Sequence, residues 1–179
     1  MTKNIFIITN SSLFAAQHLK AILRSLSSKY NVYLLTSNFK DSFKLDTDIN
    51  TINIQITRKP ALFKDIFTFL LIFYNIYIYK PSTIISFTPK AGLLSALNSC
   101  ININKNIRFI HFFTGQVWAN YSGLKRIIYK TIDKLIIFFS FTTLCDSETQ
   151  SNFLKENLSL SGKDIPKCLG SGSITGVDI

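Results

Sequence analysis

The fold is indicated first by residues 5–12, which read Ile5-Phe-Ile-Ile-Thr-Asn-Ser-Ser12. Residues 5–9 form an unbroken β-branched and aromatic run, which is typical of a strand buried on both faces in a parallel sheet. Residues 10–12 are turn and cap residues, and residues 14–26 place Leu19, Leu23 and Leu26 on one helical stripe. This strand–turn–helix unit predicts an α/β protein.

The same alternation of strands and helices continues along the chain. Further strands are expected at residues 31–36, 49–57, 83–87, 107–113, 142–145 and 165–169, with helices from Pro60, from Pro89, over residues 123–139 and from Ser147. This pattern predicts a Rossmann-like, doubly wound and mostly parallel sheet with helices on both faces, in one domain over residues 1–179. Residues 49–57 alternate Ile with polar residues, which indicates a half-exposed strand near an edge.

Two helices carry more specific expectations. Ser147 and Gln150 match a capping box at the start of the helix that follows residue 147. The helix over residues 123–139 is amphipathic. Its expected inward residues are Leu124, Ile128, Thr131 and Leu135, and its expected outward residues are Lys125, Arg126, Lys130 and Lys134.

Composition excludes some classes of protein. A hydrophobic content of 47% and an aromatic content of 13% exclude a disordered chain. The 20 Lys+Arg against 10 Asp+Glu give a net charge of +10, which favours an anionic partner such as a phosphate-bearing ligand, an acidic membrane or nucleic acid. A biased nucleotide composition of the gene is an equal explanation for the lysine richness. No nucleic-acid-binding motif is present, so we expect no nucleic-acid partner.

Cys100, Cys145 and Cys168 lie far apart without paired spacing, which argues against a disulfide framework and against a zinc site. We therefore expect no metal and a reducing cytosol. The first apolar run is too short for a signal peptide.

Residues 66–79 are almost entirely Ile, Leu, Phe and Tyr. This run is shorter than the roughly 20 residues that cross a bilayer, so a transmembrane segment is not expected. One interpretation is a helix on the membrane surface, with Phe67, Phe69 and Phe73 toward the lipid. The equal alternative is a helix that a neighbouring element covers.

Polar loops follow several of the expected strands, and in an open parallel sheet such loops share the carboxyl edge, where ligands bind. In residues 88–92, Thr88 and Pro89 are typical of a helix start, and Lys90 in the first turn suits an anion. The alternative is an ordinary cap with an exposed lysine. In residues 111–118, Thr114, Gln116 and Trp118 are the candidate binding residues, with Trp118 as a platform for a sugar ring.

Two further features are weaker. His111 lies within the strand pattern and is better interpreted as a structural histidine. Residues 170–176 are rich in glycine, but their spacing fits neither the dinucleotide-binding fingerprint nor a P-loop. They are interpreted as a flexible polar loop, as at an inter-domain hinge.

Taken in order, these segments resemble a known family. Residues 87–94, 114–118 with 123–126, Asp146 and Ser147 with Gln150, and residues 172–178 are similar to the N-terminal half of bacterial family 4 glycosyltransferases of the GT-B fold. The likeness is greatest to enzymes of capsule, O-antigen and exopolysaccharide assembly. It spans the chain from the first strand to Asp178.

The resemblance implies a retaining sugar transfer from a nucleotide-sugar, without metal or other cofactor, in a cleft between two Rossmann-like halves. Thr88, Lys90, Thr114, Gln116 and Trp118 fall on family loops that bind the acceptor. Gly172 and Ser173 fall on the loop that crosses toward the donor. The implied partners are a saccharide or lipid-linked saccharide and the anionic inner face of the bacterial membrane. A separately encoded C-terminal half is a further candidate partner.

The chain also departs from the family pattern. Many relatives carry a His-Gly pair where this chain has Thr114 and Gly115, so the family's cleft histidine has no counterpart. We expect the C-terminal donor-binding domain to be absent, and therefore little or no turnover by this chain alone, as a truncated product or as one part of a split enzyme. The alternative function is a basic, peripheral membrane-binding module without catalysis.

Overall fold

A computed structural model describes residues 2–37, 49–57, 59–101 and 107–168. Seven strands form one sheet in the order β3-β2-β1-β4-β5-β6-β7, and every pair of neighbours is parallel. The expected Rossmann-like sheet is therefore confirmed, and it is wholly parallel. Its strand order reverses between β1 and β4.

The strands are β1 (Asn4–Ile8), β2 (Asn31–Thr36), β3 (Asn50–Asn53), β4 (Thr83–Ser86), β5 (Arg108–Phe113), β6 (Thr142–Cys145) and β7 (Lys167–Cys168). The α-helices are α1 (Ser12–His18), α2 (Lys20–Ser27), α3 (Leu62–Tyr79), α4 (Pro89–Ile101), α5 (Gly123–Phe139) and α6 (Glu148–Leu158). Short 3-10 helices are η1 (Val117–Asn120) and η2 (Gly162–Asp164). β3 and β7 are shorter than expected, and β3 lies at an edge, as its alternating pattern predicts.

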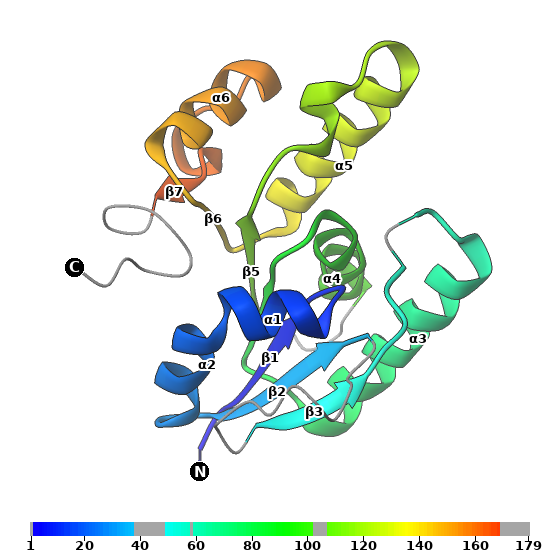
Figure 1. Cartoon of the computed structure of the whole chain (residues 1–179), viewed down its shortest axis with the longest axis vertical. Coiled ribbons are helices and arrows are strands. Elements are labelled where there is room, and N and C mark those ends of the chain that lie inside the picture. The colour runs from blue at the N-terminus through cyan, green and yellow to red at the C-terminus, as the bar shows by residue number, and fades with distance from the viewer. Residues whose placement is uncertain (1, 38–48, 58, 102–106, 169–179) are drawn as a thin grey trace.

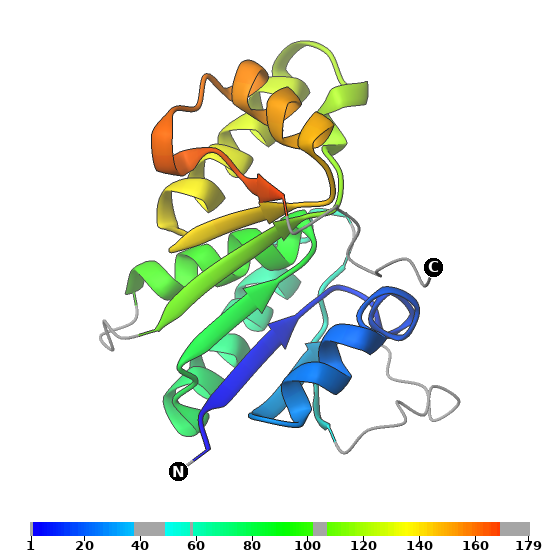
Figure 2. The same ribbon diagram turned by 90° about the vertical axis from the view of Figure 1, so that its left-hand side faces the viewer.

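Helices cover both faces of the sheet, and the apolar cluster on one face is larger than that on the other. α1 and α2 lie on one face, and α3 and α4 lie on the other (Figures 1 and 2). The residues beneath α1 and α2 form a smaller apolar cluster that includes Ile7, Leu23 and Leu34. The larger cluster includes Phe6, Ile72 and Leu94, and it also takes in Ile136 of α5 and Leu154 of α6.

One expectation about α5 is wrong. Leu124, Ile128 and Leu135 are exposed, as is Thr131, although the amphipathic pattern predicts them inward. The buried residues of α5 are Asp133, Ile136 and Ile137. The helix has apolar residues on two stripes. The stripe that faces the core carries Ile136 and Ile137, which pack in the larger cluster, together with Asp133, which accepts a hydrogen bond from Trp118.

α4 packs unusually close to the sheet at Gly92. A Cβ atom added to Gly92 would lie 2.6 Å from Cε1 and 2.7 Å from Nδ1 of His111, and 3.0 Å from Cδ1 of Ile136. His111 is buried in β5, and its Nδ1 is 2.7 Å from the hydroxyl of Ser86 in β4. Glycine at position 92 therefore lets α4 lie directly against the imidazole.

We expect Gly92→Ala to destabilise the protein by about 1–3 kcal/mol, the usual cost of overpacking a core. The loss should occur although alanine favours a helix interior over glycine by about 1 kcal/mol. Urea unfolding followed by circular dichroism measures the change in free energy of unfolding.

A double-mutant cycle with His111→Ala is the control, because removing the imidazole removes the overlap. The cost of Gly92→Ala should then shrink or reverse. An equal cost in both backgrounds would show that the contact with His111 is not responsible.

Candidate functional site

The turns after β4 and β5 lie side by side at the carboxyl edge of the sheet. Both strands are parallel neighbours, and the Thr114 hydroxyl donates a hydrogen bond of 3.2 Å to the carbonyl of Phe87. The strand order reverses between β1 and β4, and ligands of doubly wound sheets bind outside such a point. The structure thus brings the turns around Thr88 and Thr114 together, as the sequence predicts. Gly172 and Ser173 lie outside the described residues.

Polar groups at this edge remain without hydrogen-bond partners. The hydroxyl of Thr88 and Nε2 of Gln116 are both buried atoms, and neither makes a hydrogen bond within the described chain. Thr88 precedes α4 as expected, but its side chain does not cap the helix, and only its carbonyl accepts a bond, from the Gly92 N–H at 2.7 Å. Buried polar groups normally have a hydrogen-bond partner. Two such groups without a partner at this edge indicate a place where a polar ligand can bind.

Sequence reasoning missed Thr9 and Thr36 at the same edge. Thr9 follows Ile8, which pairs with Leu35, so the two threonines lie side by side at the ends of β1 and β2. Both are fully buried, and neither hydroxyl has a partner among the described residues. The signal was present in the sequence, because each threonine ends an otherwise apolar strand.

Lys90 has partners within the protein. Its Nζ lies 2.6 Å from Oδ1 of Asp65 and donates to the Thr57 hydroxyl at 2.8 Å and to the Lys59 carbonyl at 2.7 Å. These contacts join the first turn of α4 to the first turn of α3 and to the chain that precedes α3. The ammonium charge is thus balanced by a carboxylate, and the immediate role of Lys90 is to position α4. A role in binding an acceptor stays a prediction.

Trp118 does not form an open platform for a sugar. It is 1% exposed, and its ring is stacked on Phe153 of α6 with ring centroids 5.2 Å apart. Its Nε1 donates to Oδ2 of Asp133 at 2.7 Å, and Nζ of Lys130 lies 5.0 Å from the ring centroid. The interpretation of Trp118 as a sugar-stacking surface is therefore corrected. Its bulk fills the space between η1, α5 and α6.

Asp133 is a buried acid beneath this loop. Burial raises the pKa of its carboxyl from 3.8 to about 7, although the hydrogen bond from Trp118 opposes the rise. The carboxyl anchors η1 to α5 and so holds the loop that carries Thr114 and Gln116. None of the described hydrogen bonds links the Asp133 carboxyl to the side chain of Thr114 or Gln116. Its effect on these two residues is therefore through the position of the loop.

His111 is structural, as expected. It is 1% exposed, and burial lowers the pKa of its imidazole to about 3, so the ring is neutral. A neutral imidazole within 2.7 Å of the Ser86 hydroxyl links β4 to β5. It cannot serve as a general acid near neutral pH in this environment.

The capping box at α6 is confirmed in its main feature. The Ser147 hydroxyl accepts from the Gln150 N–H at 3.1 Å, and the Gln150 side chain accepts from the Asp146 N–H at 2.8 Å. Within the described part of the chain, no group of three or more His, Cys, Asp or Glu side chains could hold a metal ion.

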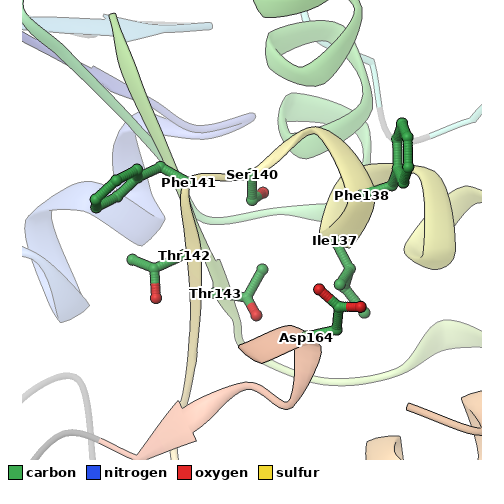
Figure 3. Close-up of a pocket in the computed structure, with 7 residues that line it drawn as sticks. All are labelled: Ile137, Phe138, Ser140, Phe141, Thr142, Thr143 and Asp164. Carbon is green, nitrogen blue, oxygen red and sulfur yellow. The ribbon is translucent and has the colours of Figure 1, made fainter. Parts of the chain in front are cut away.

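A small pocket lies at the opposite edge of the sheet (Figure 3). It surrounds the amino end of β6, where Ser140, Thr142, Thr143 and Asp164 supply its polar lining. Its volume of about 60 Å³ is well below the roughly 300–1,000 Å³ of small-molecule sites. It is therefore too small for a sugar.

No protein-family model and no curated protein sequence matches this chain. Solved structures do match its fold. UDP-N-acetylglucosamine 2-epimerase from Rickettsia bellii is 12% identical with a TM-score of 0.70, over 97% of this chain and 46% of that one. The fold is that of GT-B glycosyltransferases and UDP-N-acetylglucosamine 2-epimerases.

Glycosyltransferases are among these neighbours. Sucrose-phosphate synthase from Thermosynechococcus elongatus is 12% identical with a TM-score of 0.68, over 95% of this chain and 90% of that one. A lipopolysaccharide outer core galactosyltransferase is 13% identical with a TM-score of 0.63, over 90% of this chain and 44% of that one. The chain thus spans less than half of the epimerase and of the galactosyltransferase.

Asp133→Asn tests the buried carboxyl through the pH dependence of stability. The folded protein holds the Asp133 proton up to about pH 7, whereas an unfolded chain loses it near 3.8, so the folded state binds more protons between these values. The contribution of Asp133 to stability is therefore full below about pH 4 and is lost as pH rises through 7. Asparagine has no charge to bury and keeps an oxygen for Trp118.

Relative to the parent protein, Asp133→Asn should gain thermal stability as pH rises from about 5 to about 8. Differential scanning calorimetry at a series of pH values measures this difference in melting temperature. A difference that is constant with pH would contradict the raised pKa. Asp164→Asn, at an exposed position, is the matched control and should show a much smaller change.

Proposed function

We propose that this chain is the acceptor-binding half of a retaining glycosyltransferase that moves a sugar from a nucleotide-sugar to a saccharide in surface polysaccharide synthesis. One observation carries the proposal. Unpaired polar atoms of Thr88 and Gln116 lie at the carboxyl edge, beside the point where the strand order reverses, on a fold shared with glycosyltransferases. A saccharide is rich in hydroxyl groups and supplies the partners that these atoms lack.

The residues of this half bind and orient the acceptor. Thr88, Thr114 and Gln116 can hydrogen-bond to sugar hydroxyls, because each offers a donor or acceptor at one edge of the sheet. Lys90 keeps the first turn of α4 in place through Asp65, and Trp118 keeps the neighbouring turn in place through Asp133. We assign the donor side to the loop with Gly172 and Ser173, and no catalytic role to any residue of this half.

The activity test combines this chain with a candidate donor-binding half. The polypeptide encoded directly downstream is produced with this chain, and transfer is assayed with UDP- and GDP-sugars and with lipid-linked and free saccharide acceptors. Transfer that needs both halves supports the proposal. Failure of every transfer with both halves present contradicts it, and inversion at C2 of UDP-N-acetylglucosamine without an acceptor would indicate the epimerase reaction instead.

Binding of saccharides by this chain alone is a separate test. Thr88→Val and Gln116→Leu should each weaken binding by about tenfold, because each removes a hydrogen bond to a sugar hydroxyl and leaves the shape of the site nearly unchanged. Saturation-transfer NMR with a panel of hexoses and N-acetylhexosamines measures the effect. Thr131→Val, on the exposed side of α5, is the matched control. Unchanged binding by both site variants would place the acceptor elsewhere.

A membrane-surface role is a second proposal, carried by the inverted pattern of α3. Its buried residues include the polar Thr68 and Asn75, whereas large apolar residues face outward. These exposed residues, with exposed fractions of 48–87%, are Leu62, Phe63, Ile66, Phe67, Leu70, Tyr74, Tyr77 and Ile78. By length and composition α3 could cross a membrane, but its contacts with the sheet favour a helix that lies on the surface.

The three phenylalanines that the sequence suggests for lipid contact differ in their exposure. Phe67 is 64% exposed, but Phe69 and Phe73 are half-buried, and Phe69 contacts the larger core cluster. Phe63, which is 87% exposed, is a better lipid contact than either. The chain has a net charge of +10, which favours an anionic surface. We therefore propose that this face binds the anionic inner surface of the bacterial membrane, where lipid-linked saccharides are held.

Replacing Phe63 and Phe67 with serine together should lower sedimentation with anionic liposomes by about tenfold, because two large apolar side chains no longer enter the bilayer. The fold should survive, since both positions are exposed. Leu13→Ser, at a 44% exposed position on α1, is the matched control on the other face of the sheet. Equal binding to neutral and anionic liposomes would remove the electrostatic part of this proposal.

A further inference from the structure

Two of the cysteines lie opposite each other on neighbouring strands. Cys145 ends β6 and Cys168 ends β7, and they are register partners in a parallel pair. Cys145 is buried, Cys168 is half-buried, and both contact the larger apolar cluster, so their side chains lie on the same face of the sheet. Neighbouring strands are about 4.8 Å apart. This spacing is within the range of about 4.4–6.8 Å between Cα atoms that a disulfide bridges.

The local chemistry of the two thiols differs. Burial raises the pKa of the Cys145 thiol, and the neighbouring Cys168 adds to this rise. The Cys145 thiol lies 3.4 Å from the Ser147 carbonyl and 3.8 Å from the Pro166 carbonyl, so it is held between α6 and β7. Cys168 is the more accessible of the pair, and it is therefore the thiol that meets a reagent first.

We propose that Cys145 and Cys168 form a site of reversible oxidation, at which a disulfide joins the carboxyl ends of β6 and β7. β7 is a two-residue edge strand paired with β6, so it can adjust to the bond with little loss of sheet structure. The segment with Gly172 and Ser173 follows Cys168 directly in the sequence. A bridge would thus fix the place of Cys168, the last described residue before that segment, whatever reaction the protein catalyses.

The proposed oxidant is a low-molecular-mass disulfide such as oxidised glutathione. The Cys168 thiolate attacks one sulfur of oxidised glutathione, forms a mixed disulfide and releases one glutathione thiolate. Cys145 then loses its proton and attacks the Cys168 sulfur, which releases the second glutathione. The two protein thiols are oxidised to one disulfide, and one oxidised glutathione is reduced to two molecules of glutathione.

Mass spectrometry after treatment of the folded protein with oxidised glutathione tests the site. The expected product has lost two hydrogen atoms, and trypsin should release residues 135–155 joined to residues 168–179 by a bond that dithiothreitol cleaves. At a fixed glutathione ratio, the bridged fraction should be at least about tenfold higher in the folded protein than in urea, because folding holds the two sulfur atoms together.

Single variants separate this site from general thiol reactivity. Cys100→Ser removes the exposed cysteine of α4 and should leave the bridge unchanged. Cys145→Ala should leave glutathione attached to Cys168, and Cys168→Ser should leave Cys145 unmodified. Circular dichroism of each variant shows that the fold is retained.

Two results would overturn the proposal. The first is a stable glutathione adduct on Cys168 in the parent protein without progress to the bridge. The second is a bridge that forms as readily in urea as in the folded protein. A bridge that involves Cys100 in place of either residue would also count against it.

Discussion

The contact between Gly92 and His111 fixes the position of α4, and the candidate site depends on that position. The imidazole occupies the space where any other side chain at position 92 would lie. α4 begins at Pro89, just after Phe87, whose carbonyl accepts a hydrogen bond from Thr114 in the turn after β5. A neutral, buried histidine thus acts as a spacer between sheet and helix. The arrangement of the polar groups at the carboxyl edge thus depends on the packing of Gly92 against His111, several residues away.

The main features of the fold could be predicted from the sequence because they are local. Buried parallel strands are continuous apolar runs, and helix starts have capping residues, as at Ser147. The side of α5 that faces the core could not be predicted in this way. Its apolar residues form two stripes, and the buried one is distinguished by tertiary contacts, among them the hydrogen bond from Trp118 to Asp133. Hydrophobic periodicity alone carries no information about that partner.

The sequence predicted that the turns after β4 and β5 meet, but not the contacts that their side chains make. Lys90 and Trp118 are polar or amphipathic residues in the expected turns, but tertiary contacts with Asp65 and Asp133 occupy their polar atoms. Thr9 and Thr36 were overlooked because a threonine at the end of a β-branched run looks like part of the strand. Their unpaired hydroxyls become evident only when the sheet brings β1 and β2 together.

One side chain gives the protein a spectroscopic probe at a known place. Trp118 is the single tryptophan, and it packs among η1, α5 and α6. Its indole is buried against Phe153 and donates a hydrogen bond to Asp133, so its emission depends on these contacts. Tryptophan emission is therefore a spectroscopic gauge of the packing of η1 against α5 and α6.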